Sequence, residues 1–386
     1  MKIKRYKKRV ERTILPILFF TLCLLTSCMQ KGKNTGNSMP TKDMVKGSIR
    51  LHPDTSLNDE AKFVAGISVS NKSKELKRFT HSPFWREHQQ NMNRIWNLYQ
   101  QTSPKLTSFA QNELEDINQE CGFAFYPFSG PDFLFVNALF PKMRTYLLVG
   151  LEKLGEPIKI KNPSTDTYKL YENAVSGIFN LSFFSTEDMH SKNSNDTISG
   201  VIPIIQLLMV RSGKNIVSIK YKKLTATGVI VEGSKQDNLV EIKFYKQGSS
   251  LLQTLYYLSR NLENKSFQSH SGLRNLLKRN QSHQIVCFTK SASYLMHNDT
   301  FSNIRSFILN TSNAIVQDDS GIPWSYISPL SWNFTLYGDY HSPIREYADY
   351  EQDDLEEAYQ KADSRILNFR IGFNRQSNLQ VIVHKK

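Results

Sequence analysis

Apolar residues recur along this chain with two different spacings. Between residues 83 and 101 they stand three and four positions apart, and a second run of this kind extends to about residue 119. This spacing places apolar side chains on one face of a helix, and Ser103 and Pro104 suit the cap and first turn of the second run. We therefore expect two amphipathic helices here. Further helical patterns cover residues 166–185, 202–212, 301–312 and 346–363.

Short apolar or strand-like runs predict the strands of a sheet, and those at 146–151 and 284–289 are apolar enough to be buried. The runs span residues 123–128, 146–151, 216–221, 227–231, 240–245, 252–259, 284–289, 315–317 and 332–337. The first two enclose a helix expected over 131–140, and such a strand-helix-strand unit of about 30 residues is typical of parallel pairing. The alternation predicts an α/β fold with a mixed, partly parallel sheet and flanking helices, Rossmann-like over residues 123–152.

The first 28 residues have a different character. Residues 1–13 hold seven basic residues and one acid, an apolar run follows over 14–25, and Thr26-Ser27-Cys28 comes next. This order is typical of a secretory signal peptide, and the apolar run is shorter than the ~20 residues of a permanent span. Leu25-Thr26-Ser27-Cys28 resembles the lipobox of bacterial lipoproteins. The resemblance implies that residues 1–27 are removed and that Cys28 carries the acyl chains of a membrane anchor. An ordinary signal with a chance cysteine and an uncleaved anchor are the alternatives.

The chain after Cys28 predicts a tethered domain. Residues 28–60 are rich in Lys, Asn, Ser, Thr and Gly, which predicts a flexible tether. No break in composition follows, so we expect one α/β domain over 61–386. Position 29 is Met rather than Asp, and by resemblance to lipoproteins of enteric bacteria this implies the outer membrane, facing the periplasm.

Charge and cysteine content narrow the class of protein. The whole chain carries a net charge of +14, and loss of residues 1–27 leaves 42 basic against 34 acidic residues, or +8. A mildly basic surface chiefly favours solubility, and we expect no nucleic-acid partner. In an oxidising compartment Cys121 and Cys287 are able to form a disulfide, although buried free cysteines are also common.

A turn at residues 126–132, Tyr-Pro-Phe-Ser-Gly-Pro-Asp, is the first candidate site. Ligands of α/β sheets sit beyond the carboxyl ends of strands, and Ser129 with nearby amides could hold an anion at the following helix. In the structural interpretation Ser129 caps that helix, Pro131 occupies its first turn and Asp132 complements its dipole.

The layout around this turn resembles the first motif of nucleotide-dependent methyltransferases. There a strand, a small-residue turn and a helix precede a strand that ends in an acid, here Glu152, which the resemblance implies would bind a ribose hydroxyl. The turn departs from the motif, since Gly130 is its one glycine and Pro131 lacks an amide hydrogen. An envelope location is also remote from nucleotide cofactors, so we expect none.

Two further strings supply residue types that hydrolases use. They are Lys-Ser-Ala-Ser-Tyr-Leu-Met-His at 290–297 and Gln-Asp-Asp-Ser-Gly-Ile-Pro at 317–323. A nucleophile, a base and an orienting acid could be drawn from Ser129 or Ser293, His297, and Asp318 or Asp132. The Gly-x-Ser-x-Gly elbow is absent. One carboxylate of the Asp318–Asp319 pair is expected to cap a turn.

Aromatic residues near these acids suggest a second kind of site. Aromatic side chains beside carboxylates suit sugar rings or quaternary amines, which makes Asp319, Trp324, Trp332 and Tyr337 candidate ligand-binding residues. The alternative is that these aromatic residues pack the sheet. The spacing of His, Cys, Asp and Glu matches no metal-binding motif.

Five strings together resemble a family of exported bacterial proteins for which no activity is known. They are residues 126–134, 150–152, 291–297, 317–323 and 336–338. The resemblance spans about residues 80–375 and implies a single folded unit. The sequence thus predicts an envelope lipoprotein that binds a ligand or an envelope protein or glycan partner, with a periplasmic hydrolase as the alternative.

Overall fold

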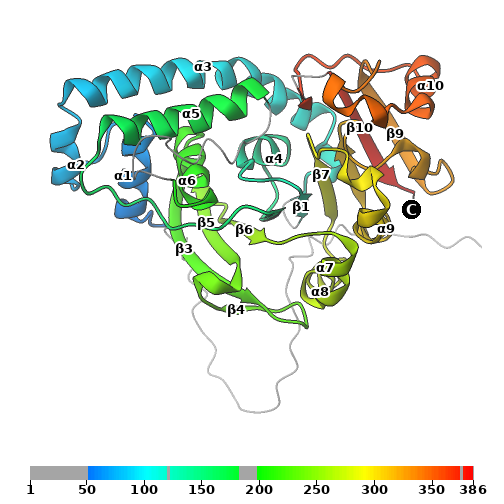
Figure 1. Ribbon diagram of the computed structural model, residues 1–386, viewed down its shortest axis with the longest axis horizontal. Coiled ribbons are helices and arrows are strands. Elements are labelled where there is room, and N and C mark those ends of the chain that lie inside the picture. The colour runs from blue at the N-terminus through cyan, green and yellow to red at the C-terminus, as the bar shows by residue number, and fades with distance from the viewer. Residues whose placement is uncertain (1–50, 120–121, 182–197, 374–376, 386) are drawn as a thin grey trace, which may run out of the picture. The chain divides into compact units, whose positions relative to one another are not determined.

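Within the residues that the computed structural model describes (51–119, 122–181, 198–373 and 377–385), ten strands form one sheet (Figure 1). They are β1 (Phe123–Pro127), β2 (Thr145–Gly150), β3 (Lys214–Leu224), β4 (Ile230–Glu232), β5 (Leu239–Lys246), β6 (Gln253–Ser259), β7 (Ile285–Thr289), β8 (Ala314–Gln317), β9 (Trp332–Gly338) and β10 (Asn378–His384). The strand order is β4-β3-β5-β6-β2-β1-β7-β8-β10-β9. Both parallel and antiparallel pairs occur, so the predicted α/β fold with a mixed sheet is confirmed.

The strands in the middle of the sheet are parallel, and the chain adds them first on one side of β1 and later on the other side. Strands β6, β2, β1, β7 and β8 run parallel as neighbours. From β1 the chain adds β2 and then β6 on one side, whereas β7 and β8 extend the sheet on the other side. Because crossovers between parallel strands are right-handed, this reversal puts the helices of the two halves on opposite faces. A crevice is therefore expected beyond the carboxyl ends of β1 and β7.

Helices cover both faces of the sheet. They are α1 (Thr55–Val64), α2 (Lys74–Phe79), α3 (Pro83–Asn112), α4 (Phe133–Leu139), α5 (Thr165–Leu181), α6 (Val201–Arg211), α7 (Asn264–Ser269), α8 (Ser271–Arg279), α9 (Ser302–Thr311) and α10 (Asp353–Lys361). The long helices α3 and α5 lie side by side, and α7, α8 and α9 gather elsewhere (Figure 1).

Successive side chains of a strand point to opposite faces of the sheet, so the core has one part on each face. In β1, Ala124 and Tyr126 join a cluster packed under α1 and α3–α6. Phe123 and Phe125 join a second cluster with residues of α7, α8 and α9. Both faces of β1 are thus buried, which explains why its sequence reads as a continuous apolar run.

The two helices expected over 83–101 and from Ser103 to about residue 119 are one helix, so that expectation was wrong. Helix α3 runs through Pro104, which stands inside it. A proline in a helix interior costs about 3 kcal/mol, because it removes one hydrogen bond and crowds the preceding turn. Buried side chains lie on both sides of Pro104, among them Trp96 and Leu106. Their burial at about 1.5–3 kcal/mol each offsets that cost.

The expected tether ends before residue 60, because residues 55–60 belong to α1. Asp54 caps this helix by accepting a hydrogen bond from the Leu57 amide at 2.9 Å. The Asn58 side chain bonds the Ile216 backbone through both its oxygen and its nitrogen, at 3.0 and 2.7 Å. Residues 49–386 form one compact unit.

Several expectations concern residues outside the described part of the chain. These are the signal peptide over 1–27, the lipidated Cys28, the tether up to residue 50, and Cys121. Cys287 lies in β7 as a buried free thiol. Among the described residues, none of the helices combines the length and the apolar character that crossing a bilayer requires.

Candidate functional site

A cleft lies beyond the carboxyl ends of β1, β2 and β7, where successive strands are added on opposite sides of β1. We call it the switch-point cleft. It consists of two adjoining pockets of about 190 and 380 Å³. Both pockets are lined by Phe128, Gly130, Glu152, Ser291 and Ser293. These residues follow the carboxyl ends of β1, β2 and β7, so the cleft occupies the position at which α/β sheets bind ligands.

The backbone around the cleft is strained. Positive φ values occur at Phe128 (58°), Ser291 (51°), Ser293 (52°) and Tyr294 (51°). In the described part of the chain, Asn238 is the one other non-glycine residue with a positive φ. Each such residue costs about 1–2 kcal/mol. Four of these five conformations therefore gather at one site, where surrounding contacts must hold them.

Two buried aspartates hold the loop that follows β7. Asp318 Oδ2 accepts a hydrogen bond from the Ser291 amide at 2.8 Å. Asp319 accepts bonds from the Tyr294 hydroxyl and, at 3.0 Å, from Asn378 Nδ2. Both aspartates are about 1% exposed or less, and burial together with the charge of Asp319 raises the pKa of Asp318 to about 7.

The expected turn cap at this pair is confirmed. Asp318 Oδ1 accepts a hydrogen bond from the Ser320 amide, two residues on, at 3.1 Å. Ser320 Oγ in turn accepts from the Ala292 amide at 2.7 Å. The 317–323 string therefore serves as a support for the strained loop and does not line the cleft.

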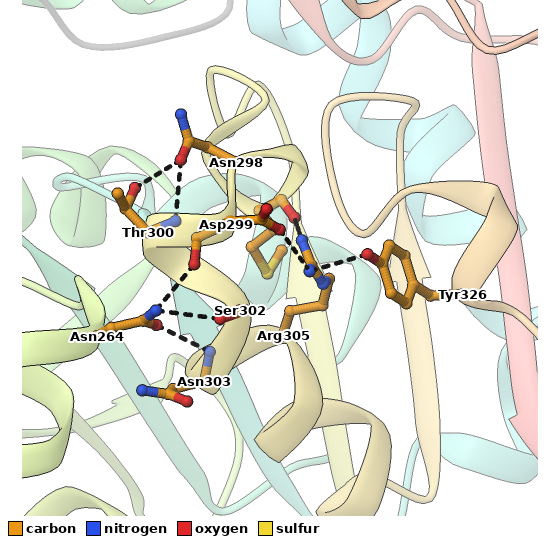
Figure 2. A network of polar contacts seen from close by, with 9 residues as sticks. Asn264, Asn298, Asp299, Thr300, Ser302, Asn303, Arg305 and Tyr326 are labelled. Atoms are coloured by element: carbon orange, nitrogen blue, oxygen red, sulfur yellow. Dashed lines mark hydrogen bonds and ion pairs between the residues drawn. The ribbon is translucent and has the colours of Figure 1, made fainter.

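Figure 2 shows a polar network that fixes the segment after this loop. Arg305, 4% exposed, donates to the Met296 carbonyl at 2.5 Å and to Tyr326 Oη at 3.0 Å. Asn264 of α7 donates to the Asp299 carbonyl at 2.8 Å and accepts from the amide of Asn303 in α9 at 2.9 Å. The network joins α7 and α9 across the segment whose residues Leu295 and Phe301 line the larger pocket.

Two residues that line the smaller pocket, Asp132 and Lys290, form a buried ion pair. Lys290 Nζ lies 2.8 Å from Asp132 Oδ2, and the side chains are 2% and 9% exposed. The same Asp132 oxygen accepts from Tyr126 Oη at 3.2 Å, and the ammonium lies 3.9 Å from the centre of the Phe135 ring. This pair links the turn after β1 to the loop after β7.

The helix after β1 is capped by a different residue from the one expected. Asp132 Oδ1 accepts from the Phe135 amide at 3.3 Å and is the cap of α4. Ser129 Oγ donates instead to the Gly130 and Val149 carbonyls, at 3.0 and 3.3 Å. Pro131 precedes the cap, so the expected helix start at residue 131 was two residues too early.

Glu152 reaches the cleft from the end of β2 because residue 150 is glycine. Glu152 Oε2 accepts a hydrogen bond from Tyr257 Oη at 2.9 Å. A Cβ atom on Gly150 would stand 2.5 Å from that carboxylate oxygen and 2.6 Å from the tyrosine oxygen. A side chain at position 150 would therefore displace the Glu152 carboxylate or the Tyr257 hydroxyl from the positions that they occupy here.

Ser291 contributes a hydroxyl group to the cleft that no other described residue binds. Its side chain lines both pockets, and the residue is 8% exposed. Within the described residues its Oγ is buried and has no hydrogen-bond partner. Sequence reasoning did not single out this residue, because its orphaned hydroxyl depends on the fold.

The hydrolase residues are brought near one another only in part. Ser129, Asp132 and Ser293 line the smaller pocket. His297 Nε2 is buried without a hydrogen-bond partner among the described residues, and burial lowers the pKa of this ring to about 4. Since Asp132 pairs with Lys290 and Asp318 binds the Ser291 amide, no hydrogen bond between described residues links a serine, His297 and a carboxylate in series.

The aromatic candidates lie away from the cleft and pack the far edge of the sheet. Trp332 and Tyr337 are 4% and 2% exposed. Tyr337 Oη donates to Glu113 at 2.7 Å, and Trp324 packs edge-on against Phe334 with ring centres 4.7 Å apart. With Asp319 bound to Tyr294 and Asn378, these contacts support the packing alternative.

No protein-family model, curated protein or solved structure matches this chain. The function therefore has to be argued from the geometry of the cleft.

Proposed function

We propose that this chain is an envelope lipoprotein whose α/β domain binds a small hydroxylated ligand in the switch-point cleft. The observation that carries this proposal is the gathering of strained residues, Phe128, Ser291 and Ser293, around one cleft. Strain of this kind persists where the surrounding structure enforces it, and it clusters at ligand sites. The position of the cleft at a topological switch point supports the same conclusion.

The lining of the cleft suits hydroxyl groups on a ligand with an apolar face. The Glu152 carboxylate is a strong acceptor for ligand hydroxyls, and the Ser291 hydroxyl is free to donate or accept. Phe128 and Phe301 pack edge-on with ring centres 5.6 Å apart and offer an aromatic wall. A sugar unit of an envelope glycan has this combination of hydroxyls and apolar ring face.

The hydrolase alternative has less support, because Ser129 and His297 have no hydrogen bond to each other. Both side chains are held by other contacts, and the low pKa of His297 leaves it a weak base.

Glu152→Gln is expected to weaken ligand binding at least tenfold. A hydrogen bond to a charged group is worth about 1.5–3 kcal/mol, and 1.4 kcal/mol is a factor of ten. Glutamine keeps an oxygen for the Tyr257 hydroxyl, so the fold should be preserved. The measurement is calorimetric titration of the full chain in detergent with a panel of monosaccharides and amino sugars.

The matched control for this experiment is Glu156→Gln. Glu156 pairs with Lys235 on the surface and does not line the cleft. A panel with no binding member, or an equal loss of affinity in both variants, would contradict the proposed function.

Cys28→Ala is expected to abolish lipid attachment. Without the sulfur no acyl chain can be attached there, and the protein should leave the membrane fraction. Metabolic labelling with radioactive palmitate, followed by membrane fractionation, measures both effects. Label that persists in the variant would rule out the anchor at Cys28.

A further inference from the structure

A second groove, of about 520 Å³, shares no lining residue with the switch-point cleft. Helices α3 and α4 supply Trp96, Tyr99 and Phe133, and Arg211 stands at the end of α6. The groove reaches Gln253, the first residue of β6. It therefore lies beside the sheet toward the amino ends of the parallel strands.

Three cations line this groove without any acid. They are Arg211, Lys214 and Lys246, and no Asp or Glu is among the lining residues. Lys214 is only 8% exposed, and Lys246 stands opposite it in the pairing of β3 with β5. Among the described residues none of the three cations takes part in an ion pair.

This arrangement opposes folding in two ways. Like charges directly opposite each other on neighbouring strands repel, and burial of an ammonium group without a partner removes its hydration. The two effects, burial first, lower the pKa of Lys214 to about 8.

Arg211 also lines this groove, and two of its nitrogen atoms have unused donors. Its Nη1 donates to Asn93 Oδ1 at 2.8 Å, and its guanidinium lies 5.9 Å from the Trp96 ring centre. Its Nε and Nη2 atoms are buried without a hydrogen-bond partner in the part of the chain that the structure describes. Buried polar groups are nearly always bonded, so these two orphaned donors indicate a missing acceptor.

We infer that this groove binds a phosphate-bearing ligand, whose phosphoryl group is held by Arg211, Lys214 and Lys246. A phosphoryl group offers up to two negative charges and several acceptor oxygens, which matches three cations and two free guanidinium donors. The ring faces of Trp96 and Tyr99 would contact the rest of the ligand. The phosphoryl group could belong to a soluble phosphate ester or to an anionic lipid headgroup.

The test is calorimetric titration of the full chain in detergent, at constant ionic strength, with inorganic phosphate and pyrophosphate. We expect both to bind, and Lys214→Met to weaken binding at least tenfold while raising the midpoint of thermal unfolding of the ligand-free protein. The opposite signs matter, because a lysine with a purely structural role would lose stability when replaced. Lys220→Met is the matched control, since Lys220 is an exposed cation of the same strand and its loss should leave affinity unchanged.

Two soluble probes distinguish the source of the phosphoryl group. Tighter binding of dihexanoylphosphatidylglycerol, below its micellar concentration, than of glycerol 3-phosphate supports the lipid headgroup. The reverse order supports a phosphate ester. Failure of all four probes to bind, or an equal loss of affinity in Lys220→Met and Lys214→Met, would overturn the inference and leave the switch-point cleft unaffected.

Discussion

Lys290→Met is expected to lower the free energy of unfolding by about 3–5 kcal/mol, the usual cost of removing one partner of a buried ion pair. The Lys290 and Asp132 side chains are 2% and 9% exposed and lie 2.8 Å apart. Methionine has nearly the same length and keeps the contact with the Phe135 ring. The change therefore tests the charge more than the packing, and equilibrium denaturation in urea measures it.

The matched comparison is a double-mutant cycle with Asp132→Asn. Asparagine is as good a helix cap as aspartate, so α4 should keep its start while Lys290 loses its counter-charge. Removal of both charges should restore part of the stability lost in each single variant, because no buried charge is then left alone. Singles that each lose less than about 1 kcal/mol, with additive effects in the double variant, would contradict this role of the pair.

The local sequence pattern predicted those helices and strands in which apolar residues follow one another closely. Strand β7 reads as a continuous apolar run because both of its faces are buried, against α9 on one side and Phe140 on the other. Helix α8 was missed, because only Leu273, Leu276 and Leu277 form its apolar face among polar residues. Strand β10 was also missed, and its place between β8 and β9 depends on pairing between distant segments.

The site was predictable only in outline. The strings at 126–132 and 290–297 were recognised, and the structure brings both to the switch-point cleft. The strain was not predictable, since Ser291, Ser293 and Tyr294 are not residues that favour positive φ. Asp318 and Asp319, about 25 residues further along the chain, hold Ser291 and Tyr294 in these conformations. The role of Gly150 was not predictable either. It depends on the space that Glu152 and Tyr257 occupy in the folded protein, which the local sequence pattern does not show.

Asp319→Asn is expected to remove part of the pH dependence of stability. In the wild type the pKa of Asp318 is raised to about 7, by burial first and then by the charge of Asp319. The folded protein thus binds this proton more tightly than the unfolded chain does. The contribution of Asp318 is most favourable below its unfolded pKa and declines, by up to about 1.4 kcal/mol per pH unit, as the pH rises toward 7.

Asparagine at position 319 can keep the local contacts while it removes the charge. Its oxygen can accept from Asn378 Nδ2, and its amide can donate to Tyr294 Oη. The free energy of unfolding of the variant relative to wild type should therefore rise between pH 4.5 and pH 8. Urea denaturation at both pH values measures this difference, and Asp339→Asn, which removes an exposed acid, should show none.

A difference that stays constant with pH would mean that the hydrogen bonds of Asp319, and not its charge, decide its effect. The expected result has a further consequence for the cleft, because Asp318 and Asp319 hold the strained loop that contains Ser291 and Ser293. Two adjacent buried carboxylates that oppose stability near neutral pH are most simply explained if that loop must keep its conformation for a ligand. A variant that is more stable at pH 8 and binds the monosaccharide panel more weakly would connect the two observations.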